Sequence, residues 1–152
     1  MKKNVSLVLV LCMIAVAVIG FGTAANAQTP SNTEKALALI NTFATGDADM
    51  ARSLLAEDYI QHNLAYGTGA DAFVGSVEYL ASAEVKTTVN NIRAFEDGDK
   101  VFLQTVYNFA GAGEQVAFDI FRIDENGKIA EHWDVMETIA DEATWQNQNG
   151  KF

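Results

Sequence analysis

The 152-residue chain is 49% hydrophobic and has 20 acidic against 10 basic residues, which gives a formal charge of −10. This length and apolar fraction suit one folded domain and exclude a disordered chain. Nucleic-acid binding depends on Lys and Arg, so the acidic balance excludes a general binder of the phosphate backbone. The composition also excludes collagen, coiled-coil, disulfide-scaffold and multi-pass membrane proteins.

Residues 1–27 have the pattern of an export signal. Two lysines precede an almost uncharged apolar run over residues 5–21, and a small-residue cleavage site ends at Ala27. We therefore predict a periplasmic or secreted mature chain, residues 28–152, that forms one domain. The length of the run leaves an uncleaved N-terminal membrane anchor as the alternative. Cleavage would remove the only Cys and lower the formal charge from −10 to −12, which disfavours anionic membranes after cleavage.

Helical signals open the mature chain. Residues 31–34 (Ser-Asn-Thr-Glu) form a capping box, and the helix predicted behind it ends at Gly46. Asp47 can cap a second short helix, and a third is predicted over about 70–81. These helices carry apolar residues at helical spacing: Ala36, Leu39, Ile40 and Phe43; Met50, Leu54 and Leu55; Phe73, Val77 and Leu80.

From about residue 85, apolar residues alternate with polar ones. Strands are predicted over 100–109, 115–123 and 128–137, with turns between them, and Asn126-Gly127 accepts the positive φ of a hairpin turn. Helices followed by antiparallel strands predict an α+β fold, in which a curved sheet has the helices on one face.

Alternation places several polar side chains on shared faces of the predicted sheet. His132 and Asp134 share one face of the last strand, while Trp133 lies on the other. Asp119 lies in an otherwise apolar strand, where a carboxylate is costly unless it is hydrogen-bonded or neutral. His62 follows the second predicted helix. Neither face of the last two strands is wholly apolar or polar, so we expect both faces to be partly covered.

Each of these residues also has an ordinary structural interpretation. A single His on a strand is more often a hydrogen-bonded structural residue than a catalyst. Asp119 could pair with Arg122 or Arg93 at a strand edge, and Trp133 is more often a core or interface residue than a platform for a ligand. Spacing alone therefore gives only a weak signal of an active site.

Two segments resemble a known family. Residues 57–63 (Glu-Asp-Tyr-Ile-Gln-His-Asn) and 119–135, which contain Gly-Lys-Ile-Ala-Glu-His-Trp-Asp, resemble the SnoaL-like (polyketide cyclase-like) branch of the NTF2-like superfamily. The end of the chain, residues 149–152, is similar to the usual tail of that branch. The resemblance extends over roughly 33–152. It is specific for the family and much less specific for an activity, since this fold hosts several enzyme classes and non-enzymes.

The resemblance implies an NTF2-like (cystatin-like) cone, with three N-terminal helices packed on a curved, mainly antiparallel sheet around a central pocket. It also implies a homodimer through the outer face of the sheet. Asp119 matches the protonated Asp that donates to the oxyanion in ketosteroid isomerases. Where those enzymes have their base, this chain has His62 and Asn63 and no carboxylate, which argues against steroid isomerisation. In the cyclases a pocket acid acts beside a carbonyl, and Asp119 and Asp134 are the candidates.

These residues can be combined into one candidate catalytic set. We predict that His132 and Asp134 form a coupled acid–base pair and that Asp119 is the second carboxyl group. His62 and Asn63 are predicted to orient the oxygen of the substrate.

Three functions are compatible with this set. The first is an enzyme without a cofactor that acts on a small, apolar carbonyl compound as an aldol-type cyclase, isomerase or lyase. The second is a binding protein for a hydrophobic small molecule. The third is a divalent metal held by two His and one carboxylate, but the family rarely uses one, so we predict no metal. Tyr59 and Met136 are predicted to line the pocket, and no nucleic-acid partner is expected.

Overall fold

The computed structural model describes residues 29–152, so the predicted signal peptide lies outside the described residues. Within the described part, no helix is both long and apolar enough to cross a membrane. The elements, in chain order, are α1 (Asn32–Thr45), α2 (Ala48–Leu54), β1 (Leu55–Gln61), α3 (Ala70–Ser82), β2 (Thr88–Asp97), β3 (Lys100–Asn108), the 3₁₀ turn η1 (Phe109–Gly111), β4 (Gln115–Ile123), β5 (Ile129–Thr138) and the 3₁₀ turn η2 (Glu142–Thr144).

The predicted helix caps are confirmed. The backbone N–H of Glu34 donates to Ser31 Oγ at 3.1 Å, and the N–H of Ser31 donates to Glu34 Oε2 at 2.7 Å. Gly46 ends α1 with a left-handed φ of 74°, and Asp47 Oδ1 accepts from the N–H of Met50 at 2.9 Å. These contacts satisfy backbone groups that the helix leaves unpaired, which explains why the boundaries could be read from the sequence.

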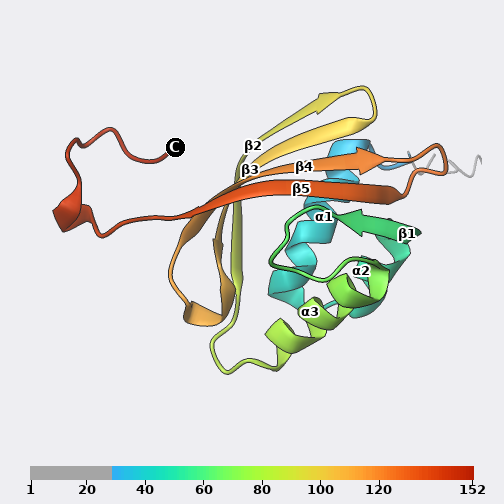
Figure 1. Ribbon diagram of the computed structural model, residues 1–152, viewed down its shortest axis with the longest axis horizontal. Helices are drawn as coiled ribbons and strands as arrows, with labels where there is room; N and C mark the ends of the chain where they lie inside the picture. Colours follow the sequence, from blue (N-terminus) through green and yellow to red (C-terminus); the bar gives the residue numbers. More distant parts are fainter. Residues whose placement is uncertain (1–28) are drawn as a thin grey trace, which may run out of the picture.

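The five strands form one sheet in the order β1-β5-β4-β3-β2. The pairs β2–β3, β3–β4 and β4–β5 are antiparallel, whereas β1 runs parallel to β5. All three helices lie against one face of this curved sheet (Figure 1), which confirms the predicted α+β architecture. The predicted bounds of β4 are observed, and no bound of β3 or β5 differs from its prediction by more than one residue.

Strand β1 has no counterpart among the elements that the sequence analysis predicted. Residue Leu55, assigned there to the second helix, begins this strand, which continues through Gln61. The parallel pairing sets Gln61 opposite His132 in the ladder, and the N–H of His62 donates to the carbonyl of His132 at 2.9 Å. The pairing thus joins the end of β1 to the middle of β5.

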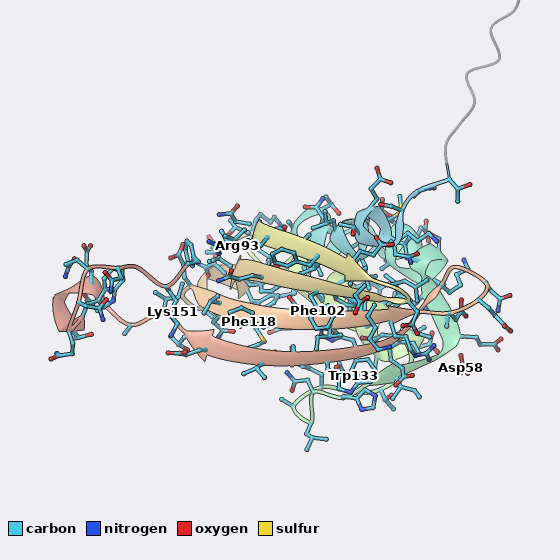
Figure 2. The ribbon with its side chains drawn as sticks, turned by 90° about the horizontal axis from the view of Figure 1, so that it is seen from above. Asp58, Arg93, Phe102, Phe118, Trp133 and Lys151 are labelled. Carbon is cyan, nitrogen blue, oxygen red and sulfur yellow. The ribbon has the colours of Figure 1, made fainter. Side chains whose placement is uncertain are left out.

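The two faces of the sheet differ in burial. Toward the helices, Leu103, Ala117 and Phe121 are buried and belong to the core. On the opposite face, Phe102 and Phe118 are exposed among other large apolar side chains, and Figure 2 looks onto this face. The core and any cavity within it therefore lie between the helices and the inner face.

The end of α1 gives a test of the packing. At Gly46 an added Cβ would require a left-handed residue and would lie 2.7 Å from the Cβ of Ala81 in α3. Gly46→Ala should therefore lower the free energy of unfolding by at least about 1 kcal/mol, as measured by chemical denaturation. Gly75→Ala is the matched control, since a Cβ added there would meet nothing within 4 Å and Ala is the better helix former. A Gly46→Ala protein as stable as wild type would contradict this account.

Candidate active site

A cavity of about 480 Å³ lies between the helices and the inner face of the sheet. Its polar lining includes Asp119, His132 and Asp134. Its volume is typical of small-molecule sites. The Phe and Tyr residues that line it come from α1, the loop after β1, α3, β3, η1 and β4, and they are Phe43, Tyr66, Phe73, Tyr79, Tyr107, Phe109 and Phe121. Phe118, which the alternation places on the opposite face, lies outside this cavity.

The register of the sheet brings the three titratable residues together. Asp119 on β4 lies directly opposite Asp134 on β5, and Phe121 lies opposite His132. Because alternate residues of a strand point to the same face, His132 and Asp134 are adjacent on the inner side. One ligand atom from each of the three residues lies within 4.8 Å of the others. The predicted coupling of these residues therefore has a geometric basis.

Asp119 is 4% exposed and has a partner for each carboxylate oxygen. The hydroxyl of Tyr107 donates to Oδ2 at 2.9 Å, and Oδ1 lies 3.1 Å from Nε2 of His132. Burial and the neighbouring charge of Asp119 raise the pKa of Tyr107 well above its usual value, so its hydroxyl remains a donor. The expected direct hydrogen bond from Asp119 to a substrate oxyanion thus competes with two contacts within the protein.

His132 is fixed from both sides of its ring. Its Nδ1 lies 3.1 Å from Oε1 of Gln61, and Phe121 stacks on the ring with the centroids 4.4 Å apart. Only 6% of His132 is exposed. The imidazole therefore has a defined orientation within the wall of the cavity.

Asp134 differs from Asp119 because it is only partly buried. Its Oδ1 accepts from Nδ2 of Asn63 at 2.6 Å, and the orientation of that amide is set by the N–H of Ala65, which donates to Asn63 Oδ1 at 2.9 Å. Burial is the largest influence on the pKa of Asp134 and raises it above 3.8. The charge of His132 and the Asn63 hydrogen bond act in the opposite direction, and the charge of Asp119 adds to the increase. Asp134 is therefore suited to exchange a proton in the pocket.

His62 lies away from this group, on the outer side of the sheet. Its Nε2 is 3.0 Å from Oε2 of Glu131, and its ring stacks on Trp133 with the centroids 4.4 Å apart. His62 follows Gln61 directly, so the alternation of β1 directs the two side chains to opposite faces. We therefore correct the candidate set by leaving out His62. Asn63, assigned with it to the substrate oxygen, instead contacts Asp134.

The remaining predictions concern two pocket-lining residues and the partners of Asp119. Met136 lines the cavity, as expected, whereas Tyr59 is buried in the core, where its ring meets Phe73 edge-on. Asp119 pairs with neither of the arginines considered for it. Arg122 instead forms a salt bridge with Glu131 at 2.5 Å, and Arg93 donates to the side chain of Gln104.

Within residues 29–152, a divalent cation could be held only by one His and two carboxylates. His62 lies outside the cluster, so the arrangement of two His and one carboxylate does not form. Asp119, His132 and Asp134 are the ligands with suitable spacing among residues 29–152. A cation would also have to replace the existing contact between His132 Nε2 and Asp119 Oδ1.

Sequence reasoning missed the roles of Gln61 and Tyr107. Without a predicted β1, Gln61 has no assigned face, and Tyr107 is given no role beyond its place in the strand predicted over 100–109. The burial of Tyr59 two residues before Gln61 gives both side chains one inward face. A strand assignment for β1 would therefore have directed Gln61 to the pocket.

The comparison with known families agrees with the fold and the pocket. Residues 36–132 match the family described as SnoaL-like domain. The chain belongs to this SnoaL-like family. The match spans most of the described domain and confirms the resemblance found in the sequence. No curated protein matches the SnoaL-like chain.

Solved structures are similar to this chain over 70–73% of its length. An NTF2-like protein of unknown function from Cytophaga hutchinsonii is 17% identical with a TM-score of 0.62, over 73% of this chain and 94% of that one. The putative polyketide cyclase IdmH from Streptomyces antibioticus is 19% identical with a TM-score of 0.57, over 71% and 93%. An LEH-like epoxide hydrolase from M. tuberculosis is 17% identical with a TM-score of 0.61, over 70% and 82%. At these identities the similarity establishes the NTF2-like fold of the SnoaL-like chain.

The contact between Asn63 and Asp134 gives a prediction that needs no substrate. Asn63→Ala removes a hydrogen bond that favours the charged carboxylate, so the pKa of Asp134 should increase further above 3.8. A ¹³C NMR titration of the Asp134 carboxyl group measures this directly. Because its pKa is raised on folding, its ionisation lowers stability as the pH rises through the folded value, and the variant should lose more stability there.

Asn90→Ala is the matched control for this titration, since Asn90 is an exposed residue on β2. The control should leave the pKa of Asp134 at its wild-type value. An unchanged or lower pKa in Asn63→Ala would show that the amide does not stabilise the carboxylate.

Proposed function

We propose that this SnoaL-like protein is an exported, cofactor-independent acid–base enzyme that acts on a small, largely apolar carbonyl compound. The reaction is an aldol-type cyclisation, an isomerisation or a lyase reaction. The observation that carries the proposal is the pairing of a half-buried Asp134, whose pKa is raised, with the hydrogen-bonded Asp119–His132 pair in an aromatic cavity. Export is tested by the mass of the mature protein, which should begin at Gln28.

The chemistry requires one base and one acid at the same carbonyl compound. Removal of a proton from the carbon beside a carbonyl needs a base whose pKa is moved toward the working pH. It also needs a proton donor where negative charge develops on the oxygen. Asp134 supplies the base, and the Asp119–His132 pair supplies the donor.

The lining of the cavity indicates which compounds fit. Its walls are aromatic, and neither Lys nor Arg is among the described residues that line it. A carboxylate or phosphate on the substrate would face Asp119 and Asp134 without a compensating cation. The preferred compound is therefore an uncharged ketone, aldehyde or lactone with an aromatic or aliphatic body.

A binding protein for a hydrophobic small molecule is the second candidate. One observation favours this function. Both oxygens of Asp119 and both ring nitrogens of His132 already have hydrogen-bond partners within the protein. A binding site needs no exchangeable proton, and these contacts would then serve only to support the aromatic walls. The two functions differ in whether a bound compound is converted.

A ligand-stabilisation screen of the mature chain, followed by product analysis, separates the two functions. Small ketones, aldehydes, lactones and aromatic polyketide-like compounds are tested for a rise in melting temperature and then for conversion. For a converted compound, Asp134→Asn should lower kcat about 100-fold or more because the base is lost, while the compound still binds. His132→Ala and Asp119→Asn should also lose conversion.

Asp58→Asn is the control for these variants, because Asp58 is an exposed carboxylate on β1 at the edge of the sheet (Figure 2). Its kcat should equal that of the wild type. Compounds that bind unchanged to wild type and to all the variants would overturn the enzymatic proposal and establish the binding protein.

We also propose that the protein forms a homodimer through the outer face of the sheet. The support is an apolar patch on this face, which surrounds a groove of about 240 Å³. Large exposed apolar patches are typical of protein interfaces. The exposed side chains that line the groove are Phe95, Phe102, Phe118 and Val135.

The dimer predicts that Phe118→Asp places a charge in the interface and produces a monomer. Size-exclusion chromatography with light scattering gives the mass of each variant. Leu64→Asp is the matched control, since Leu64 is 99% exposed, lies in the loop after β1 and is not among the residues that line the groove. A wild-type protein that remains monomeric at high concentration would refute the interface.

A further inference from the structure

The amide of Gln61 has an orientation that the backbone determines. Its Oε1 accepts from the N–H of Asn63 at 2.9 Å, and the same oxygen lies 3.1 Å from Nδ1 of His132. A reversed amide would place its NH₂ group against the N–H of Asn63, donor against donor. The oxygen of Gln61 therefore faces His132.

This orientation decides which ring nitrogen of His132 is protonated. An amide oxygen can only accept a hydrogen bond, so Nδ1 of His132 must carry a proton. The other nitrogen, Nε2, then faces Oδ1 of Asp119 at 3.1 Å. The second oxygen of Asp119 accepts from Tyr107, so the carboxyl group has no rotation that would avoid His132 without losing that contact.

The 3.1 Å hydrogen-bond contact between Nε2 of His132 and Oδ1 of Asp119 requires one proton between them. Without it, a nitrogen lone pair would face a carboxylate oxygen inside the protein, which is repulsive. The proton can lie on the nitrogen, as imidazolium and carboxylate, or on the oxygen, as imidazole and carboxylic acid. Both forms have a net charge of zero, and both contain a single proton that can be transferred.

We infer that Gln61 is a positioning residue that keeps Nδ1 of His132 protonated and thereby stores one transferable proton between His132 Nε2 and Asp119 Oδ1. This inference rests on the proposed acid–base function and assigns the acid within it. Gln61 performs this role from β1, through its register with His132 in β5.

The stored proton is the one that the carbonyl oxygen receives in the first step of the reaction. Asp134 takes the proton from the carbon beside the carbonyl, and the electron pair of the C–H bond forms the new carbon–carbon double bond. The π pair of the carbonyl moves to its oxygen, which receives the proton stored by Asp119 and His132. Asp134 is then protonated and the pair carries a charge of −1. Return of both protons restores the starting site.

The tautomer of His132 is the direct test, and it needs no substrate. Long-range ¹H–¹⁵N NMR spectra separate protonated from unprotonated ring nitrogens, and His62 is the only other His in the chain. The wild type should show Nδ1 of His132 protonated. Gln61→Leu removes the acceptor and should reduce the protonated Nδ1 population, whereas Gln61→Glu keeps an acceptor oxygen and should preserve it.

The kinetic test uses the same variants with a converted compound. Gln61→Leu should lower kcat about 10- to 100-fold with little change in KM, and Gln61→Glu should recover most of the loss. Gln148→Leu is the matched control because Gln148 is exposed, lies after β5 and is not among the residues that line the cavity. Melting temperatures of all three variants show whether a loss of kcat comes from unfolding.

The outcomes separate this inference from the proposed function. An unchanged His132 spectrum in a folded Gln61→Leu protein overturns the positioning role, whether or not the protein is an enzyme. The expected spectra without conversion of any carbonyl compound would support the positioning role and refute the proposed function. Zn²⁺ that binds stoichiometrically and replaces the Nε2 proton signal would overturn the stored proton.

Discussion

The parallel pairing of β1 with β5 joins two segments that are about 70 residues apart in the chain. It sets the end of β1 and the residues just after it beside the strand that carries His132 and Asp134. Two amides from this stretch then contact the site, Gln61 at His132 and Asn63 at Asp134. Each amide is oriented by a backbone N–H, so the fold of the loop determines which atom faces each titratable group.

The site shows how one sheet can keep two nearby carboxyl groups in different states. Asp119 is enclosed and has a partner for each oxygen, which offsets the cost of its burial. Asp134 is less enclosed and accepts one hydrogen bond from the described residues, so burial raises its pKa. The difference in environment separates the acid from the base even though the two residues are direct neighbours across β4 and β5.

The sequence predicted the features that depend on local contacts. The capping box at Ser31, the cap at Asp47 and the alternation of β4 each arise from residues close in the chain, and each is observed. Strand β1 was missed because its buried positions do not alternate regularly and its partner strand is remote in sequence. That single omission hid Gln61 and left His62 in the candidate set, since the face of a side chain follows from its place in a strand.

Neither Lys nor Arg is among the described residues that line the aromatic cavity. The net charge of the protein therefore affects the rate at which a charged compound reaches the cavity. The mature chain predicted here would have a charge of −12, so anionic solutes meet a repulsive potential before they reach the entrance. Dissolved salt screens that potential within about 10 Å at 0.1 M. The association rate of an anionic compound would therefore increase with ionic strength, whereas that of an uncharged ketone would be nearly independent of it. The acidity of the protein thus selects among solutes at a distance, before the shape of the pocket has any effect.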